Sequence, residues 1–315
     1  MKLAILCSGQ AGQHSRMLDD ILDAPDCAEL RALASEVLGQ DIATWWRGLD
    51  AKQIFANANA QFAIALYQIA TWARIASVVP QPAVVAGYSL GEVLAWHVAG
   101  ALDVAQTLRL VRLRAELMDR VAATLPPGSG EGCMVLWRGR STPAMRAARE
   151  RAMTTHGLEI AIHRPGGDLV LGGPESAIDA FVADPAVQHA DLKRLQVSVP
   201  SHTRWLADAV EPFRDALAAS PLADPVVPVL AGIDGNVLRR RSDALANLPA
   251  QLARPLHWDW CQETLASLGV DVALELGPGN DLAKLLEMGE AGGAARGVEE
   301  FGSVAGLREW LEVHQ

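Results

Sequence analysis

The amino-acid sequence predicts an α/β fold, because strand and helix patterns alternate in both halves of the chain. Lys2 to Cys7 is a short apolar run that leads into a glycine-containing loop, as expected of a buried strand. Residues 83–100 repeat this order, with a strand, a tight turn and a helix. After residue 195 the alternation resumes, with apolar runs at 226–230 and 272–276 that predict two more strands. This pattern is typical of a sheet core covered by helices.

The elements of the first third of the chain follow in order. Lys2 to Cys7 is expected in the middle of the sheet, and the loop after it ends at Gln13. Apolar residues that recur every three or four positions predict a helix with one buried face; they are Phe62, Leu66, Ile69, Ala73 and Ala76. The elements predicted next are a strand at 83–86, a turn at 87–91, and helices at 92–100 and 104–121.

The clearest linker of the chain, Leu125 to Gly132, introduces a different pattern. The segment after it predicts a small inserted α+β unit of about 70 residues, below the usual size of a large independent core. Its predicted strands are 134–137, 158–162 and 169–171, and its predicted helices are 143–155 and 174–182. We therefore expect a large discontinuous domain at 1–126 and 196–315, and a small domain at 127–195.

Composition excludes several classes of protein. Half of the 315 residues are hydrophobic and 20% are charged, which is far from the signature of disorder. No apolar stretch reaches the roughly 18 to 20 residues that span a bilayer, and the start lacks a cleavable signal pattern, so we expect a cytoplasmic protein. A net charge of −10 argues against wholesale binding to nucleic acid or anionic membrane.

Metal and redox motifs are not found in the sequence. The four cysteines lie far apart without C-x-x-C spacing, so we expect reduced, mostly buried thiols and no metal site. No nucleotide or flavin motif is found either.

The segment Gly87-Tyr88-Ser89-Leu90-Gly91 matches the G-x-S-x-G pattern between a predicted strand and a predicted helix. Glycines at both ends permit a cramped turn that projects the serine hydroxyl, and the start of a helix favours negative charge beside it. Ser89 is therefore the candidate nucleophile. The alternative is an ordinary turn flanked by glycines.

A serine nucleophile needs a base, and His202 is the candidate among the eight histidines. It follows an alternating segment at 195–200 and opens a predicted helix that runs to about residue 219, a strand-end position where α/β sites gather. A helix N-terminus also disfavours imidazolium, which would keep the base neutral. The alternative is a histidine that merely begins a helix.

Arg114 is predicted to project from the buried face of its helix. Its neighbours three and four positions away are all apolar: Leu110, Val111, Leu117 and Met118. A buried guanidinium needs an anion, which is either an internal Asp or Glu or a substrate carboxylate gripped by its planar fork.

These features together resemble the malonyl-CoA:acyl-carrier-protein transacylase family over nearly the full length of the chain. Residues 9–13 resemble its G-Q-G-S-Q loop, residues 87–92 its G-H-S-L-G-E elbow, and residues 197–202 its V-S-V-P-S-H segment. Arg114 falls at the family's arginine position. Gln251 matches the glutamine of its Q-L-x-x-P-V-Q-W segment, and residues 275–279 match E-x-G-P-G.

The resemblance implies a hydrolase-like α/β domain with a parallel sheet core and a small inserted ferredoxin-like α+β subdomain. It implies that Ser89 attacks a malonyl thioester and that His202 takes its proton, with Gln251 orienting His202 through a carbonyl. The backbone N–H groups of Gln10 and Leu90 would stabilise the oxyanion, a contribution of about 3 to 4 kcal/mol per donor.

The resemblance also implies the substrate and the partner. Arg114 would hold the free malonyl carboxylate, and the malonyl-serine ester would pass to the thiol of an acyl carrier protein in a ping-pong cycle. Malonyl-CoA is then a substrate, and no cofactor is permanently bound. Lys193 and Arg194 are candidates for docking an acidic carrier protein.

The chain departs from the family pattern at several positions. Ser8 replaces a proline, residues 11–12 replace Gly-Ser, and Tyr88 replaces a histidine. His163 falls near a pocket asparagine, so that Tyr88 and His163 could reshape the acyl or pantetheine pocket. These departures resemble the branch that serves malonate decarboxylase, whose epsilon subunit charges a dedicated carrier subunit. We expect that branch, with the malonyl-CoA:ACP transacylase of fatty-acid or polyketide synthesis as the alternative.

Two other functions use the same residues differently. A serine hydrolase predicts a carboxylate partner for His202, but gives no role to Arg114 or to the segment around Gln251. A non-catalytic docking subunit that kept the fold predicts that replacing Ser89 changes nothing.

Overall fold

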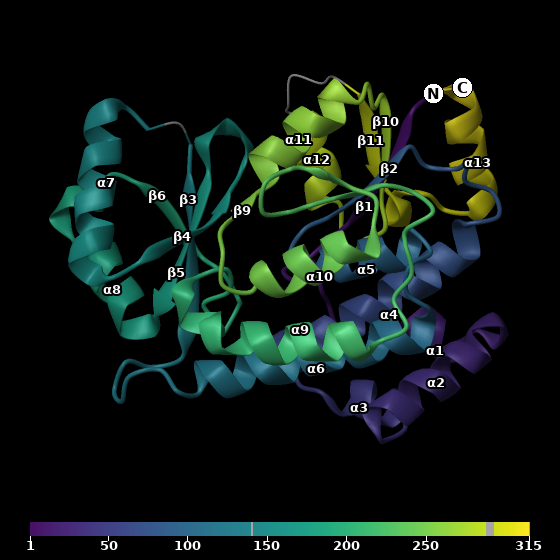
Figure 1. Ribbon diagram of the computed structural model, residues 1–315, viewed down its shortest axis with the longest axis horizontal. Helices are drawn as coiled ribbons and strands as arrows, with labels where there is room; N and C mark the ends of the chain where they lie inside the picture. The colour runs from purple at the N-terminus through teal and green to yellow at the C-terminus, as the bar shows by residue number, and fades with distance from the viewer. Residues whose placement is uncertain (140, 288–292, 315) are drawn as a thin grey trace.

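A larger, mostly parallel sheet forms the core of the molecule (Figure 1). The computed structural model describes residues 1–139, 141–287 and 293–314. In this part of the chain the sheet has the order β11-β10-β1-β2-β7-β8, and only the β7–β8 pair is antiparallel. Its strands are β1 (Leu3–Cys7), β2 (Val84–Gly87), β7 (Val229–Leu230), β8 (Val237–Leu238), β10 (Val272–Glu275) and β11 (Ala294–Gly297). The central position predicted for the first strand is confirmed.

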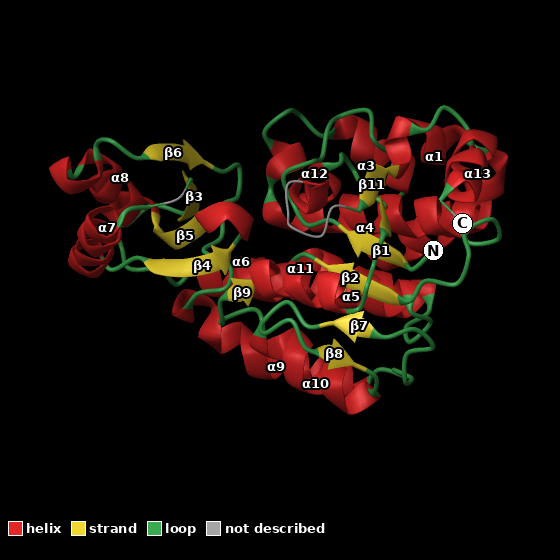
Figure 2. Cartoon of the chain, turned by 90° about the horizontal axis from the view of Figure 1, so that it is seen from above, coloured by secondary structure: helices red, strands yellow, loops and turns green. Residues whose placement is uncertain are grey.

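A smaller sheet lies beside the larger one and is mostly antiparallel (Figure 2). Its order is β6-β3-β5-β4-β9, and only the β4–β9 pair is parallel. Its strands are β3 (Gly132–Arg138), β4 (Glu159–His163), β5 (Leu169–Pro174), β6 (Asp191–Arg194) and β9 (Leu256–His257). With α7 (Pro143–His156) and α8 (Glu175–Ala183), the chain order β3-α7-β4-β5-α8-β6 is the ferredoxin-like arrangement.

The remaining helices surround the larger sheet. They are α1 (Asp19–Asp23), α2 (Ala28–Leu38), α3 (Ile42–Gly48), α4 (Asn57–Ile75), α5 (Leu90–Val98), α6 (Val104–Ala122), α9 (Val210–Ala219), α10 (Arg241–Ala250), α11 (Trp258–Ser267), α12 (Asp281–Glu287) and α13 (Val304–Val313). Helix α6 begins at a capping box, in which Asp103 accepts from the Gln106 N–H at 2.8 Å. None of the helices in the described residues is both long and apolar enough to cross a bilayer.

The two sheets share buried side chains. Along β3, Cys133, Val135 and Trp137 pack with the apolar residues of α7 and α8, because alternate residues of a strand face opposite sides. Met134 and Leu136 face the other way and join the cluster that contains β1 and β2 residues. All strands of the smaller sheet except β9 fall within 127–195, and the division into two domains at these boundaries remains our proposal.

Several sequence predictions need correction. Residues 195–200 form bends rather than a strand, and the chain continues through a 3₁₀ turn at Arg204–Ala209 before α9 begins. His202 therefore does not open a helix. Helix α5 starts at Leu90 rather than at residue 92, directly after the turn. Strands β6, β8, β9 and β11 were not predicted; β6 is exposed and polar, and β8 and β9 have only two residues each.

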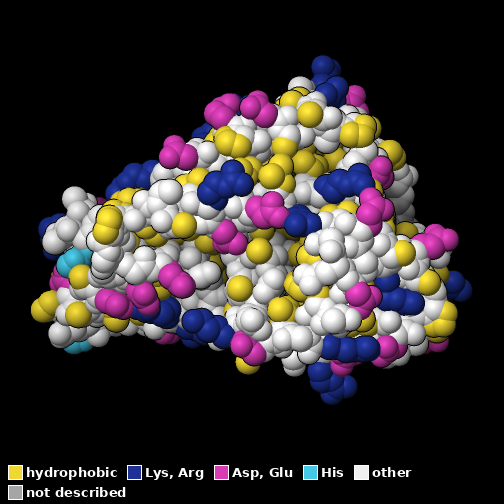
Figure 3. All heavy atoms as spheres, turned by 90° about the horizontal axis from the view of Figure 1, so that it is seen from below, with side chains coloured by type: hydrophobic (Ala, Val, Ile, Leu, Met, Phe, Trp, Pro, Cys, Tyr) yellow, Lys and Arg dark blue, Asp and Glu magenta, His cyan; other side chains and the backbone are white. Residues whose placement is uncertain are grey.

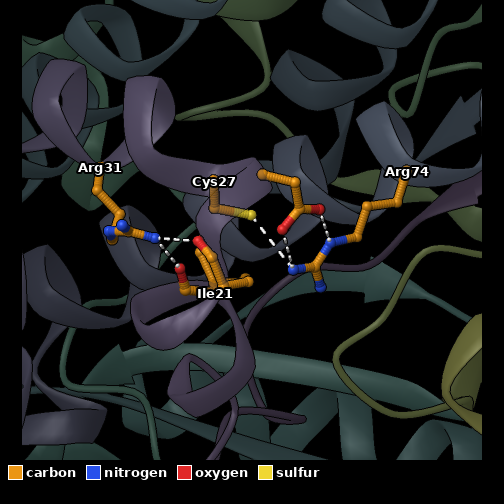
Figure 4. Close-up of polar contacts among 6 residues, drawn as sticks. Ile21, Cys27, Arg31 and Arg74 are labelled. Carbon is orange, nitrogen blue, oxygen red and sulfur yellow. Dashed lines mark hydrogen bonds and ion pairs between the residues drawn. The ribbon is translucent and has the colours of Figure 1, made fainter.

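The four cysteines are buried and free, as predicted. Cys27 packs beside the N-terminal helices, where the Arg74 guanidinium donates to its Sγ at 3.3 Å and to Asp26 at 3.1 Å (Figure 4). Arg31 of α2 donates to the Ile21 carbonyl of α1 at 3.1 Å and also to the Ala24 carbonyl, which connects the two helices.

On the face shown in Figure 3, Lys and Arg side chains are interspersed with Asp and Glu rather than gathered into one basic area.

Candidate active site

The turn between β2 and α5 holds Ser89 in a strained conformation. Its φ of 57° and ψ of −112° lie where non-glycine residues are rare, as in the nucleophile elbow of hydrolases. A Cβ at Gly91 would lie 1.9 Å from the Cys7 carbonyl oxygen, so only glycine lets α5 approach β1 this closely. A Cβ at Gly87 would lie 2.2 Å from the backbone of Gly91. Both glycines of the G-x-S-x-G motif are therefore required by packing.

The residues with strained backbone conformations lie around one cleft. Three non-glycine residues in the described chain have positive φ: Ala11 at 117°, Ser89 at 57° and His202 at 63°. All three line the same cleft. Such conformations cost about 1 to 3 kcal/mol each and persist where the surroundings enforce them, often at functional sites.

Ser89 and His202 are joined by a hydrogen bond. The Ser89 Oγ lies 2.7 Å from His202 Nε2, and His202 Nδ1 lies 2.5 Å from the backbone carbonyl oxygen of Gln251. Because a carbonyl only accepts, Nδ1 carries the proton and Nε2 presents its lone pair to the Ser89 hydroxyl. This tautomer allows the serine proton to pass to His202.

The imidazole of His202 is held neutral by its surroundings. Burial and the nearby Arg114 charge lower the pKa of His202 to about 3, while its bond to the Gln251 carbonyl acts in the opposite direction. The sequence attributed neutrality to a helix N-terminus, and that reason is wrong because no helix begins at His202.

Arg114 lies on α6 directly behind Ser89. It is 1% exposed, and its predicted apolar neighbours are buried. Its Nη1 donates to Gln61 Oε1 at 2.7 Å, and its Nη2 lies 3.4 Å from Ser89 Oγ and 3.5 Å from Gln251 Oε1. No carboxylate among the described residues forms a salt bridge with it. The alternative of a direct internal ion pair is therefore not found there.

Glu92 is the acidic residue whose charge acts on the pKa of Arg114, and the sequence analysis gave it no role. Glu92 is fully buried and accepts from Gln251 Nε2 at 2.9 Å and from the Gly232 N–H at 3.0 Å. Burial raises the pKa of Glu92 to about 8, so this carboxyl group is mostly protonated at neutral pH. The Arg114 charge consequently remains available to an anion. Glu92 lies three residues after Ser89, inside the elbow motif. This position is the signal in the sequence that could have identified Glu92 as a site residue.

The two proposed oxyanion donors have free N–H groups. Neither the Gln10 nor the Leu90 N–H donates a hydrogen bond to any described residue. Gln10 lines the cleft beside Ser89, and Leu90 is the first residue of α5, where an N–H has no partner within the helix. The adjoining loop is anchored by Gln68, whose Nε2 donates to the Ser8 carbonyl at 2.8 Å.

A cleft of about 410 Å³ lies between the two sheets and reaches Ser89 and His202. We call the group Ser89, His202 and Arg114 the floor, although Arg114 lies behind the cleft surface. We call the side chains from the smaller sheet the wall: Met134, Leu136, Arg138, Ile162, Arg164, Val170 and Lys193. The wall carries three cations, and the Asp168 carboxylate lines the cleft with them.

Tyr88 and His163, the two residues expected to reshape the pocket, lie in different places. Tyr88 lines the cleft and packs edge-on against Trp258, with ring centroids 5.4 Å apart. His163 does not line it, since Ile162 and Arg164 face the cleft and the residue between them faces away. Its ring stacks on His257 instead, at 4.2 Å. The expectation that His163 shapes the pocket is corrected on this ground.

The two candidates for carrier docking, Lys193 and Arg194, have different surroundings. Lys193 lines the cleft, whereas Arg194, the next residue of β6, forms ion pairs with Glu175 at 3.1 Å and with Asp179. Only Lys193 is therefore placed to meet a ligand at the cleft.

Comparison with known proteins gives a consistent result. Residues 6–242 match the model of the family described as acyl transferase domain. The chain is 30% identical over 294 residues to the malonyl CoA-acyl carrier protein transacylase of Escherichia coli, covering 90% of this chain and 91% of that protein.

Solved structures agree with these sequence matches. The crystal structure of MCAT from Mycobacterium tuberculosis superposes with a TM-score of 0.87 at 26% identity, covering 98% of this chain and 100% of that chain. A malonyl-transacylase in complex with a type II PKS acyl-carrier protein gives the same TM-score and identity, covering 98% and 99%. The predicted α/β fold class is confirmed.

Proposed function

Because the chain belongs to the acyl transferase domain family, we propose that it moves a malonyl group from malonyl-CoA to the thiol of an acyl carrier protein through an ester on Ser89. It is an acyltransferase. The carrier is proposed from the names of the chain's relatives, one of which was solved with a carrier protein bound. These relatives support the fatty-acid or polyketide alternative over the malonate decarboxylase branch that we expected from the sequence.

In the first half of the reaction, the Ser89 oxygen attacks the thioester carbonyl and its proton moves to His202 Nε2. The oxyanion forms beside the free N–H groups of Gln10 and Leu90. When the carbon–sulfur bond breaks, the CoA sulfur takes the proton from His202. In the second half, His202 removes the proton of the carrier thiol, the thiolate attacks the ester, and Ser89 recovers its proton.

The observation that carries the proposal is the position of Arg114. Its guanidinium lies 3.4 Å from Ser89 Oγ and has no salt bridge within the described residues. A malonyl ester on Ser89 would place its free carboxylate only two carbons beyond the reacting carbonyl, within reach of this cation. An acetyl group offers no such charge. At the cleft rim, Arg138, Arg164 and Lys193 would meet the phosphates of CoA.

The proposal is tested by intact-protein mass after brief exposure to malonyl-CoA. We expect a gain of one malonyl group per chain, mapped to the peptide that contains Ser89 and removed on addition of a holo carrier protein. The Ser89→Ala chain should gain nothing, and Cys7→Ser, a change at a buried thiol, serves as control. A label on any other residue, or an undiminished label in Ser89→Ala, contradicts the proposed nucleophile.

The malonate decarboxylase branch is the second candidate, and Tyr88 favours it. A tyrosine ring packed on Trp258 in the cleft differs from the histidine that the family usually has there. Transfer rates to the dedicated decarboxylase carrier and to a fatty-acid carrier, measured in parallel, separate the two. A faster rate with the fatty-acid carrier removes this branch.

A serine hydrolase is less well supported, because the partner of His202 Nδ1 is a carbonyl and not a carboxylate. Rapid loss of the malonyl label without a carrier thiol would favour it.

A further inference from the structure

A cluster of two histidines and one aspartate lies on the far side of β4 from the cleft. His163 and His257 are paired in register on the adjacent parallel strands β4 and β9. Asp259 follows in the first turn of α11. One ligand atom from each of the three side chains can be chosen so that all lie within 4.8 Å of one another, and all three residues are half-buried. Positions 163 and 257 are distant in sequence, so no spacing motif reveals this cluster.

Two atoms in the cluster lack a partner. His257 Nδ1 and Asp259 Oδ1 are buried and make no hydrogen bond within the described residues, although at 3.5 Å they form an ion pair when His257 is protonated. A group that binds both atoms would satisfy them together. By contrast, His156 Nε2 and Asp184 Oδ2 lie 2.9 Å apart and satisfy each other.

We propose that His163, His257 and Asp259 bind a transition-metal ion of the Zn²⁺, Co²⁺ or Ni²⁺ class. Two imidazole nitrogens and one carboxylate oxygen suit these borderline ions, whereas Mg²⁺ and Ca²⁺ prefer sites made of oxygen alone. Three protein ligands leave at least one coordination position for water.

Metal binding requires one ring to rotate out of the stack, because the His163 and His257 rings are nearly parallel and a metal lies in the plane of each imidazole that binds it. Tetrahedral coordination with bonds of about 2.1 Å separates ligand atoms by about 3.4 Å, which is less than the present spread. The His257 ring is fixed between His163 at 4.2 Å and Trp260 at 3.6 Å. The His163 ring lies at the end of this stack, and rotation about its χ2, a broad torsion in histidine, directs its lone pair toward the other two ligands.

A bound ion would strengthen the attachment of β9 and α11 to β4. Strand β9 joins the smaller sheet through two register pairs only, Ile162 with Leu256 and His163 with His257. An ion held by His163 on one side and by Asp259 of α11 on the other would add a third connection. Because it binds only the folded chain, it would raise the thermal midpoint.

The test is a Co²⁺ titration of the full-length chain after chelator treatment, followed by visible absorption and calorimetry. We expect one Co²⁺ per chain, a spectrum of four- or five-coordinate cobalt, displacement by Zn²⁺, and a rise of several degrees in the thermal midpoint with either ion. Mg²⁺ should produce none of these changes.

Variants identify the ligands. His163→Asn and Asp259→Asn should each weaken Co²⁺ binding at least tenfold, while His156→Asn, at the satisfied pair, leaves it unchanged. Metal-free thermal midpoints show whether each variant is folded, and two ligand variants guard against the failure of one. The proposal is overturned if the native chain binds no Co²⁺, or if folded ligand variants bind it as tightly as the native chain.

Discussion

The floor and the wall of the cleft differ in how far their charged and polar groups are buried. On the floor, Ser89, His202 and Arg114 are joined by contacts of 2.7 and 3.4 Å, and two of the three are almost completely buried. On the wall, the smaller sheet presents apolar side chains and the cations Arg138, Arg164 and Lys193 to an open space. Electrostatic effects are strong where water is excluded and weak where it is present. We therefore expect floor substitutions to change the chemical step and wall substitutions to change binding.

The largest effect is expected from the floor, at His202. His202→Ala removes the acceptor of the Ser89 proton, and loss of a general base typically lowers a rate by about 10²- to 10⁴-fold. The loss should be equal for malonyl-CoA and acetyl-CoA, because both need the same proton transfer. Rapid-quench measurement of acyl-enzyme formation checks this, and a loss confined to one substrate would contradict the role of His202 as base.

Arg114→Ala should slow the transfer of the malonyl group much more than that of the acetyl group. We expect malonyl transfer to fall at least about 30-fold, since removing one partner of a buried charge pair typically costs about 2 to 5 kcal/mol. Acetyl transfer near pH 8 should change little. Arg114→Lys is the matched control, which keeps the charge and loses the planar fork. Equal losses for both acyl groups would show that Arg114 supports the fold of the floor rather than the malonyl carboxylate.

The same substitution should move the pH profile. The Arg114 charge is one of the causes that lower the pKa of His202 to about 3, so removing it raises that pKa. The acid limb of acetyl transfer, where His202 becomes protonated and loses its function as base, should therefore shift to higher pH in Arg114→Ala. An unshifted limb would mean that burial alone keeps the imidazole neutral.

Glu92 links the pH response to the malonyl carboxylate. Because its pKa is about 8, raising the pH above 8 ionises Glu92 and compensates part of the Arg114 charge. The KM for malonyl-CoA should then rise severalfold between pH 7 and 9, while acetyl transfer stays flat. Glu92→Gln keeps the shape without the charge and should remove this rise. A malonyl KM that responds to pH equally in both chains would exclude Glu92 as its source.

The floor could be found from the sequence and most of the wall could not. Ser89 lies in a local motif whose glycines are required by packing within a few residues, and Arg114 shows its burial through its helical neighbours. His202 and the carbonyl of Gln251 as its partner were expected from the family resemblance, but the positive φ of His202 was not, since this geometry depends on segments about fifty residues apart. The orientation of His163 follows from strand register, and β9 exists only through its pairing with β4. Such long-range pairings leave little local signal.

The smallest effect is expected on the wall, where adjacent residues provide their own control. Lys193 faces the cleft and Arg194 faces away into pairs with Glu175 and Asp179. Lys193→Ala should raise the KM for an acidic carrier protein about two- to fivefold, because an exposed charge contributes about 0.5 to 1 kcal/mol. The difference should shrink in high salt, while kcat stays constant. Arg194→Ala removes the same charge from the opposite face and should leave this KM unchanged. If Arg194→Ala has the larger effect, the carrier approaches over the outer face of β6, and the wall serves only the pantetheine arm.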